Sequence, residues 1–299
     1  MRKRVVGLGE VLWDILPERT CLGGAPANFA YITTLIGDEG IVASRVGEDS
    51  LGLEALRRMG ELKLNIDYIQ SDRDRATGTV KVELDAKGQA KFEIASPVAW
   101  DFLEWTPDWR VLAATTDAVC FGSLAQRSEV SRATIRKFLA ATSPTAVKVF
   151  DVNLRQSYFT EEILGESMRL ADIVKLNDEE LPKVMKIGNF PHQDELSSAR
   201  RLAKEYDLKV VCVTRGGRGS LLVRGEDVSE HPGFKVRVAD TVGSGDAFTA
   251  GLVHEYLQGA SLDGMNEVAN RVGAWVASEV GAMPTPKHGA LDDLLAEIR

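Results

Sequence analysis

A turn of small and acidic residues lies in the last fifth of the chain, with the sequence Asp240-Thr241-Val242-Gly243-Ser244-Gly245-Asp246. Gly243 and Gly245 lack side chains, so the backbone can approach an anion with its N–H groups exposed, and the helix that follows adds the positive end of its dipole. Asp246 falls in the first helical turn, where the dipole favours its ionised form and where it could accept a proton from an attacking hydroxyl. The turn predicts a phosphoryl-transfer site, although a simple helix cap by Ser244 or Asp246 is an equally common use of such residues.

The positions of the strands and helices are predicted by five short apolar runs, which are typical of strands buried on both faces. The runs are Val5 to Leu8, Ala118 to Phe121, Ala146 to Phe150, Ile173 to Leu176 and Val210 to Val213. Helical patterns separate them, including Val130 to Ala141, Glu162 to Ala171 and Asp194 to Tyr206. This alternation predicts an α/β fold with a mainly parallel central sheet.

Polar and glycine residues follow each predicted strand. In open α/β sheets ligands bind beyond the carboxyl ends of the strands, so these residues are expected around the site. They are Gly9-Glu10, Gly122-Ser123, Asp151 to Asn153, Asn177 and Thr214 to Gly217.

Residues 79–94 break the rhythm, because apolar and polar residues alternate strictly on both sides of Ala86-Lys87-Gly88. Such alternation predicts an antiparallel hairpin with one solvated face. The hairpin is either a lid over the site or an edge decoration without function. No linker or internal repeat divides residues 1–299, so a single domain is expected, with a lid formed by about residues 10–25 and 76–99.

Composition narrows the class of protein. The 299 residues carry a formal charge of −8, with 44 acidic and 36 basic side chains, which argues against a nucleic-acid partner. No run approaches the ~20 apolar residues of a membrane span, and the N-terminus does not resemble a signal peptide, so a cytoplasmic protein is expected. The cysteines, Cys21, Cys120 and Cys212, lack metal-ligand spacing and are expected to be reduced thiols.

Five motifs, in order along nearly the whole chain, resemble those of the ribokinase-like (PfkB) carbohydrate kinases. The segment Asp240 to Phe248 resembles the C-terminal signature of that family, and Gly23 to Ala30 (GGAPANFA) resembles its di-glycine segment. The other three are Asp151 to Arg155 (DVNLR), Asn177 to Glu180 (NDEE) and Thr214 to Gly219 (TRGGRG). The resemblance implies a three-layer α/β/α fold with a small β lid, and an ATP-dependent sugar kinase. A Walker A sequence is absent, so the glycine turn would bind the phosphates.

The resemblance also implies roles for individual residues. Asp246 would be the catalytic base, with Gly243, Ser244 and Gly245 as the anion hole and Arg155 near the substrate and phosphates. The residues expected at the sugar are Asp14, Gly23, Gly24 and Asn28. Independently, the Asp14 carboxylate could accept hydrogen bonds from two vicinal hydroxyls, but it could equally be a turn residue before Pro17. The candidate walls of the lid are Trp13, Phe92, Ile94 and Trp100, unless these are simply core residues.

The nucleotide and metal sites follow from the same resemblance. The residues implied at the nucleotide are Asn177, Thr214, Gly216, Gly219 and, on the predicted helix Leu262 to Ser278, Asn270. Glu180, with Asn177, would hold Mg²⁺ through water, which suits a hard ion that keeps part of its hydration shell. Backbone oxygens of Asp240, Val242 and the Gly281 loop would bind K⁺. Without the family, Asn177 and Glu180 would indicate only a helix cap, and Asn270 a solvated side chain.

The sequence from Gly9 to Pro17, followed by that from Leu22 to Asn28, is most similar to the fructokinase branch of the family. This similarity implies D-fructose as substrate and fructose 6-phosphate as product, while ribose, 2-keto-3-deoxygluconate and nucleoside kinases share the motifs. Two other classes stay open: a non-catalytic sugar sensor, and a dinucleotide-binding oxidoreductase, which the incomplete glycine fingerprint at Gly7 and Gly9 disfavours. Lid edges could pair two chains into a homodimer.

Overall fold

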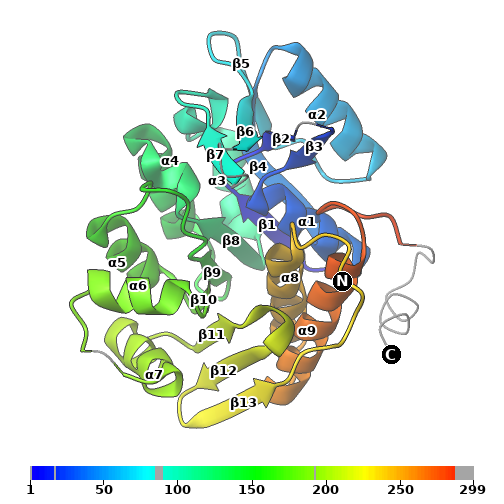
Figure 1. Ribbon diagram of the computed structural model, residues 1–299. Helices are drawn as coiled ribbons and strands as arrows, with labels where there is room; N and C mark the ends of the chain where they lie inside the picture. The colour runs from blue at the N-terminus through cyan, green and yellow to red at the C-terminus, as the bar shows by residue number, and fades with distance from the viewer. Residues whose placement is uncertain (1, 17, 85–89, 192, 287–299) are drawn as a thin grey trace.

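The computed structural model describes residues 2–16, 18–84, 90–191 and 193–286, which form a layered α/β structure with two sheets (Figure 1). The main sheet consists, in chain order, of β1 (Arg4–Leu8), β4 (Glu39–Gly47), β5 (Ile69–Asp72), β8 (Ala118–Gly122), β9 (Val147–Asp151), β10 (Ile173–Asn177), β11 (Val210–Thr214), β12 (Ser220–Arg224) and β13 (Asp227–His231). Its spatial order is β13-β12-β11-β10-β9-β8-β1-β4-β5. The pairs from β11 to β5 are parallel, whereas β12 and β13 are antiparallel. The predicted fold class is confirmed.

All five predicted strands are present, as β1, β8, β9, β10 and β11. Their apolar residues are buried on both faces, as expected for parallel strands covered by helices. Strand β4 is not predicted by an apolar run, because Ser44 and Arg45 interrupt its apolar residues although both are buried. The edge strand β13 is not predicted either, because most of its side chains are exposed.

Two helical layers cover the main sheet. The helices are α1 (Ala25–Leu35), α2 (Ser50–Glu61), α3 (Pro107–Thr115), α4 (Glu129–Ala141), α5 (Glu161–Leu170), α6 (Glu180–Ile187), α7 (Glu195–Tyr206), α8 (Ser244–Leu257) and α9 (Leu262–Ser278). The core residues fall into two clusters: one packs α3 to α7 on the sheet, and the other packs α1, α2, α8 and α9. Figure 1 shows α8 and α9 side by side, with α1 next to α8. None of these helices is long and apolar enough to cross a membrane.

The small sheet has the order β3-β2-β6-β7 and consists of β2 (Leu12–Ile15), β3 (Thr20–Gly23), β6 (Gly78–Leu84) and β7 (Ala90–Ile94). Strands β6 and β7 form the antiparallel hairpin that alternation predicts, with Val80 opposite Ile94. The predicted turn, Ala86-Lys87-Gly88, and the Phe92 side chain lie outside the described residues. Trp13 and Trp100 are fully buried, so both contribute to the core of the protein.

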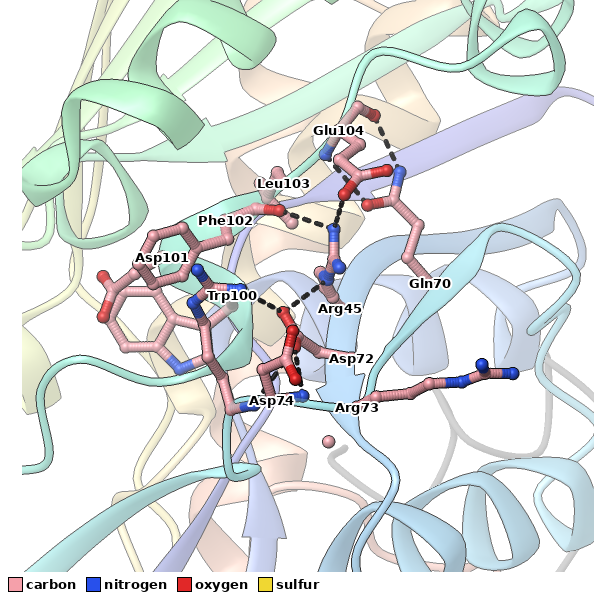
Figure 2. A network of polar contacts seen from close by, with 12 residues as sticks. Arg45, Gln70, Asp72, Arg73, Asp74, Trp100, Asp101, Phe102, Leu103 and Glu104 are labelled. Carbon is pink, nitrogen blue, oxygen red and sulfur yellow. Dashed lines mark hydrogen bonds and ion pairs between the residues drawn. The ribbon is translucent and has the colours of Figure 1, made fainter.

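A network of charged groups joins β4 and β5 to the segment after the hairpin (Figure 2). The Arg45 guanidinium pairs with Asp72 at 2.9 Å and Glu104 at 2.6 Å, and it donates to the Phe102 carbonyl at 2.8 Å. The Asp72 carboxylate, which is 1% exposed, also accepts the backbone N–H groups of residues 74 and 75. A buried charge is tolerated only when it is paired in this way, so the network fixes one arrangement of these segments.

Asp72→Ala is therefore expected to lower the free energy of unfolding by about 3 kcal/mol, because it leaves the Arg45 guanidinium without its buried carboxylate partner and with only the exposed Glu104. The control is Arg73→Ala: the Arg73 side chain is 85% exposed and points away from the network in Figure 2. This control should change stability by less than about 0.5 kcal/mol. Urea unfolding of both variants checks the prediction, and equal losses would contradict it.

Candidate active site

Residues at the carboxyl ends of the central strands line a small cleft. Its walls include Glu10 after β1, Gly122 at the end of β8, Asn153 after β9, and the carboxylates of Asp151 and Asp246. Polar strand ends thus meet at one edge of the sheet, as the sequence predicts. A larger hollow, of about 580 Å³, lies between α5, α6 and α7, and no residue of the five motifs is among its described walls.

The glycine turn forms the start of α8. Gly243 is the N-cap with φ of 78°, and a Cβ at this position would lie 2.4 Å from the Ala282 Cβ. Two constraints therefore require glycine here, the backbone conformation and the close approach of the loop at Ala282. The first amides of a helix have no acceptor within the helix, so they can bind an anion where no other group accepts them. In this turn the Ser244 N–H donates to the Thr241 carbonyl at 3.3 Å.

Asp246 lies in the first turn of α8 and its Oδ2 accepts a hydrogen bond from the Asn28 amide at 2.8 Å. Its side chain is half-buried, and desolvation, followed by the charge of Asp151, raises its pKa to about 6. The helix dipole predicted to keep Asp246 ionised thus acts against burial. Because a pKa of about 6 is below 7, the carboxylate is still mostly ionised at neutral pH and can accept a proton.

The residues predicted at the sugar lie on the small sheet and at the start of α1. Asp14 is on β2, and a Cβ on Gly23 would lie 2.9 Å from its Oδ2, so this glycine makes room for the carboxylate. Gly24, the N-cap of α1 with φ of 106°, packs against the Glu10 backbone. Asn28 is buried, and its Oδ1 has no hydrogen-bond partner among the described residues. Asn28 connects this group of residues directly to Asp246.

Glu10 is a buried carboxyl group of the cleft, 3% exposed, whose Oε2 has no hydrogen-bond partner within the described part of the chain. Desolvation raises its pKa to about 7, and the charge of Asp246 adds to this effect. Since the folded protein binds this proton more tightly than the unfolded chain, stability is lost as the pH rises from about 4.5 to about 7.

Glu10→Gln removes the dependence of stability on the ionisation of Glu10. As the pH rises from 5 to 8.5, the free energy of unfolding of the variant is expected to increase by up to about 3 kcal/mol relative to that of the wild type, since one pKa unit corresponds to about 1.4 kcal/mol. Melting temperatures of both proteins at the two pH values check this, with Glu226→Gln as control because the Glu226 side chain is 99% exposed. A difference that does not change with pH would show that Glu10 is ionised normally.

A buried ion pair between Lys175 on β10 and Asp151 on β9 was not predicted from the sequence. The Lys175 Nζ lies 3.1 and 3.0 Å from the two Asp151 carboxylate oxygens, and the Thr249 hydroxyl is 3.1 Å from Asp151 Oδ2. All three side chains are buried. The sequence contains one signal of this pair, because a lysine within the buried run Ile173 to Leu176 requires a partner for its charge.

The loop predicted at the nucleotide follows β11, where Thr214 ends the strand and Arg215 donates its N–H to the Gly219 carbonyl at 2.7 Å. Gly219 has φ of 81° and packs on the His231 backbone. Gly216 also has positive φ, with open space around it. These glycines shape a tight, exposed turn at the edge of the site.

Asn270 is buried on α9, and its amide nitrogen donates to Ser220 at 2.7 Å and to the Asn266 side chain at 2.9 Å. Asn266 in turn donates to Ser229 at 3.1 Å. The network joins α9 to β12 and β13, so the solvated alternative for Asn270 does not hold. Its amide nitrogen is occupied by protein contacts, which leaves packing as its direct contribution in this structure.

The Glu180 carboxylate, 5% exposed, is held by two backbone amides, with Oε1 2.8 Å from the Leu154 N and Oε2 2.9 Å from the Asn177 N. Each oxygen retains a lone pair that could accept a proton from the water shell of a cation, which fits the predicted indirect contact with Mg²⁺. Among residues 2–16, 18–84, 90–191 and 193–286, no group of three His, Cys, Asp or Glu side chains is arranged to hold a metal directly.

Asp240 joins the two loops predicted to bind K⁺. Its carboxylate accepts the N–H of Val242 at 3.1 Å and that of Gly281 at 3.2 Å. Arg19, from the segment between β2 and β3, pairs with the same carboxylate at 2.7 Å. The two loops are therefore close in space. Backbone oxygens, the predicted ligands, are donors that suit a hard monovalent cation.

Arg155 is exposed in the loop after β9. Desolvation raises the pKa of three carboxyl groups, and the positive charge of Arg155 opposes this rise in each of them. The three groups are Glu10, Asp14 and Asp246. An exposed guanidinium near an acidic cleft is suited to bind a phosphate or a sugar.

Comparison with known proteins gives one consistent family. The family model of the pfkB family carbohydrate kinases matches residues 19–288. The chain is 32% identical to a fructokinase of Escherichia coli, over 95% of this chain and 96% of that protein. It is 27% identical to an ATP-dependent ribose-1-phosphate kinase of Halopiger xanaduensis, over 98% of both chains.

Solved structures of other kinases share the fold of this chain. A sugar kinase of Pyrococcus horikoshii in complex with ATP superposes with a TM-score of 0.81 at 27% identity, over 94% of this chain and 95% of that one. A fructokinase of Vibrio cholerae, with fructose, ADP and a calcium ion bound, gives a TM-score of 0.83 at 24% identity, over 100% and 99% of the two chains. The family of this chain follows from these matches, whereas its sugar does not.

Proposed function

Since the chain belongs to the pfkB family of carbohydrate kinases and is a phosphotransferase with an alcohol acceptor, we propose that it transfers the γ-phosphoryl group of ATP to D-fructose, giving fructose 6-phosphate. The observation that carries the proposal is the hydrogen bond of 2.8 Å from Asn28 to Asp246. It joins the residues proposed at the sugar to the carboxylate proposed as base, directly beside the glycine turn.

In the proposed reaction, Asp246 accepts the proton of the primary hydroxyl as its oxygen attacks the γ-phosphorus, and the bond from that phosphorus to the β-γ bridging oxygen breaks to release ADP. The amides from Gly243 to Gly245 stabilise the charge on the phosphoryl oxygens. Asn28 orients the base, and Arg155 closes on the phosphates from the mouth of the cleft.

The proposed nucleotide site is the turn of Thr214, Gly216 and Gly219, with Asn270 supporting its floor through Ser220. Relatives of the same fold have been solved with ATP or ADP bound, which supports nucleotide binding by this chain. Bound Mg²⁺ would neutralise phosphate charge. Glu180 and Asn177 would hold its water shell from below.

We also propose K⁺ at the backbone oxygens of Asp240, Val242 and Gly281, because a cation between these loops would fix the start of α8. Another fructokinase structure from Vibrio cholerae contains fructose, ADP and a potassium ion, at 23% identity. Activity in KCl compared with tetramethylammonium chloride tests this site.

Fructose is favoured by the fructokinase relatives and by the sequence of residues 9–28. The small sheet, as the proposed lid, would close over the sugar and exclude water. Its exposed edge β3 is the proposed dimer contact, which light scattering of the purified chain would test.

The test of the substrate is a coupled ADP-release assay with Mg²⁺-ATP against fructose, ribose, ribose 1-phosphate, 2-keto-3-deoxygluconate and adenosine. We expect kcat/KM for fructose to exceed the others by at least about tenfold, since mismatched hydroxyls leave buried polar groups unpaired. A preference for ribose 1-phosphate would instead agree with the Halopiger relative. ADP release with none of them would favour a sugar sensor.

A further inference from the structure

We propose that Lys175, which lies outside all five motifs, is a positioning residue for phosphoryl transfer: its fixed ammonium beneath Gly245 supplies positive charge to the anion hole and to the neighbouring carboxylate of Asp246. The proposal rests on the proposed function for its kinetic consequences. Its geometric basis is independent of the sugar.

Lys175 lies at the centre of β10, with Asp151 of β9 and Cys212 of β11 as its partners in register. Neighbours in register on parallel strands point to the same face, so Lys175 and Asp151 both project toward the helical layer that contains α8. Their side chains are 9% and 6% exposed, and both Asp151 oxygens contact the ammonium. The cation is therefore held in one position.

That position is directly below the glycine turn. A Cβ added to Gly245 would lie 3.1 Å from Lys175 Nζ, so glycine allows the turn and the ammonium to approach closely. Thr249, one turn further along α8, has its hydroxyl 3.1 Å from Asp151 Oδ2 and 2.9 Å from the Gly245 carbonyl oxygen. The ion pair thus supports the first turn of α8 from beneath, at both Gly245 and Thr249.

Charge explains why a cation is needed here. Several ionisable groups face the pair of Lys175 and Asp151 from different elements. They are Glu180 on α6, Asp246 on α8, Glu10 after β1, and the thiols of Cys120 on β8 and Cys212 on β11. Two further cations act on these groups: the exposed Arg155, and Arg127, which pairs with Asp101 and acts on Glu10. Burial raises the pKa of both thiols, so they stay neutral. Lys175 is the buried cation that contacts Asp151 and the glycine turn.

The effect on the base has a definite sign. Asp151 raises the pKa of Asp246, whereas Lys175 and Arg155 lower it. Without Lys175, Asp151 would be a buried anion with no counter-ion beside Asp246, and Asp246 would hold its proton to higher pH. An anionic phosphoryl group above the turn would also meet less positive charge.

The experiment compares the wild type with Lys175→Met and with the double variant Lys175→Met/Asp151→Asn, which leaves no unpaired buried charge. We expect Lys175→Met to lower kcat about tenfold at pH 8, with KM for sugar and ATP changed less than about threefold. The pH at which kcat falls to half on the acid side should move about one unit upward from pH 6. In the double variant this midpoint should return toward pH 6, while kcat at pH 8 stays about fivefold or more below that of the wild type.

A ¹³C-carboxyl NMR titration of Asp246, assigned with Asp246→Asn, measures the same midpoint without substrate, so it tests the charge effect even if the proposed function fails. A merely structural pair would lower the melting temperature and leave both kcat and the Asp246 midpoint unchanged. That result in a folded Lys175→Met protein would overturn the proposal. If the single variant does not fold, a double variant with wild-type kcat at pH 8 would overturn it equally.

Discussion

Asp246→Asn is expected to lower turnover by about 10²–10⁴-fold, since this is the contribution of a general base and the amide cannot accept the proton. The variant should fold and bind ATP and sugar, because Asn28 can still donate to the remaining amide oxygen. At pH 7 its melting temperature should equal or exceed that of the wild type, because it removes a carboxylate whose pKa is raised to about 6 by burial. ADP release and thermal unfolding together check these expectations.

The matched control is Asp263→Asn, which changes an exposed aspartate in the first turn of α9. Its turnover should stay within about twofold of the wild type, as expected for a surface substitution outside the site. In the wild type, kcat should fall as the pH drops below about 6, because the base is then protonated. Near-normal turnover in Asp246→Asn would remove Asp246 from the mechanism.

Gly243→Ala is expected to lower kcat by at least about 10²-fold, comparable to the loss of an oxyanion-hole donor. The added Cβ would lie 2.4 Å from the Ala282 Cβ and in a backbone conformation with φ of 78°, so the turn must move. A shift of the turn displaces the amides that would face the phosphoryl group. Steady-state kinetics with ATP and the preferred sugar measure this loss.

Gly259→Ala is the control that separates the effect of backbone strain from the effect of displacing the glycine turn. Gly259 follows the other end of α8 with φ of 74°, but nothing lies within 4 Å of its added Cβ. The control should lose about 1 kcal/mol of stability from the unfavourable backbone conformation while keeping kcat within about twofold. Equal kinetic losses in the two variants would mean that α8 responds as a whole and that the turn has no special role.

Much of the fold could be predicted because the central strands are uniformly apolar and the helices between them are periodic. Where polarity interrupts a buried strand, as at Ser44 and Arg45 in β4, the same rule fails. Burial of those residues depends on partners such as Asp72, which are remote in sequence and become visible only in three dimensions.

The site was predicted in parts. Motifs single out Asn28 and Asp246, but the hydrogen bond between them spans 218 positions and cannot be derived from spacing. Lys175 lies within the apolar run Ile173 to Leu176, and no local pattern in the sequence relates it to Asp151. The solvated alternative for Asn270 was wrong for a similar reason, because its partner Ser220 lies on a strand 50 residues away.

The proposed site is divided between the N-terminal segment and the start of α8, and this division bears on how such a protein can diversify. Asp14, Gly23 and Asn28 are encoded in the first tenth of the chain, whereas Gly243 and Asp246 come from the last fifth. With the roles proposed above, substitutions that adapt the pocket to a new hydroxyl pattern can accumulate in one stretch of the gene while the stretch proposed to perform the chemistry stays unchanged. Asn28 links the two stretches of the chain, because its amide donates a hydrogen bond to Asp246, the proposed base. Exchange of N-terminal segments between relatives should therefore succeed only when this contact is preserved.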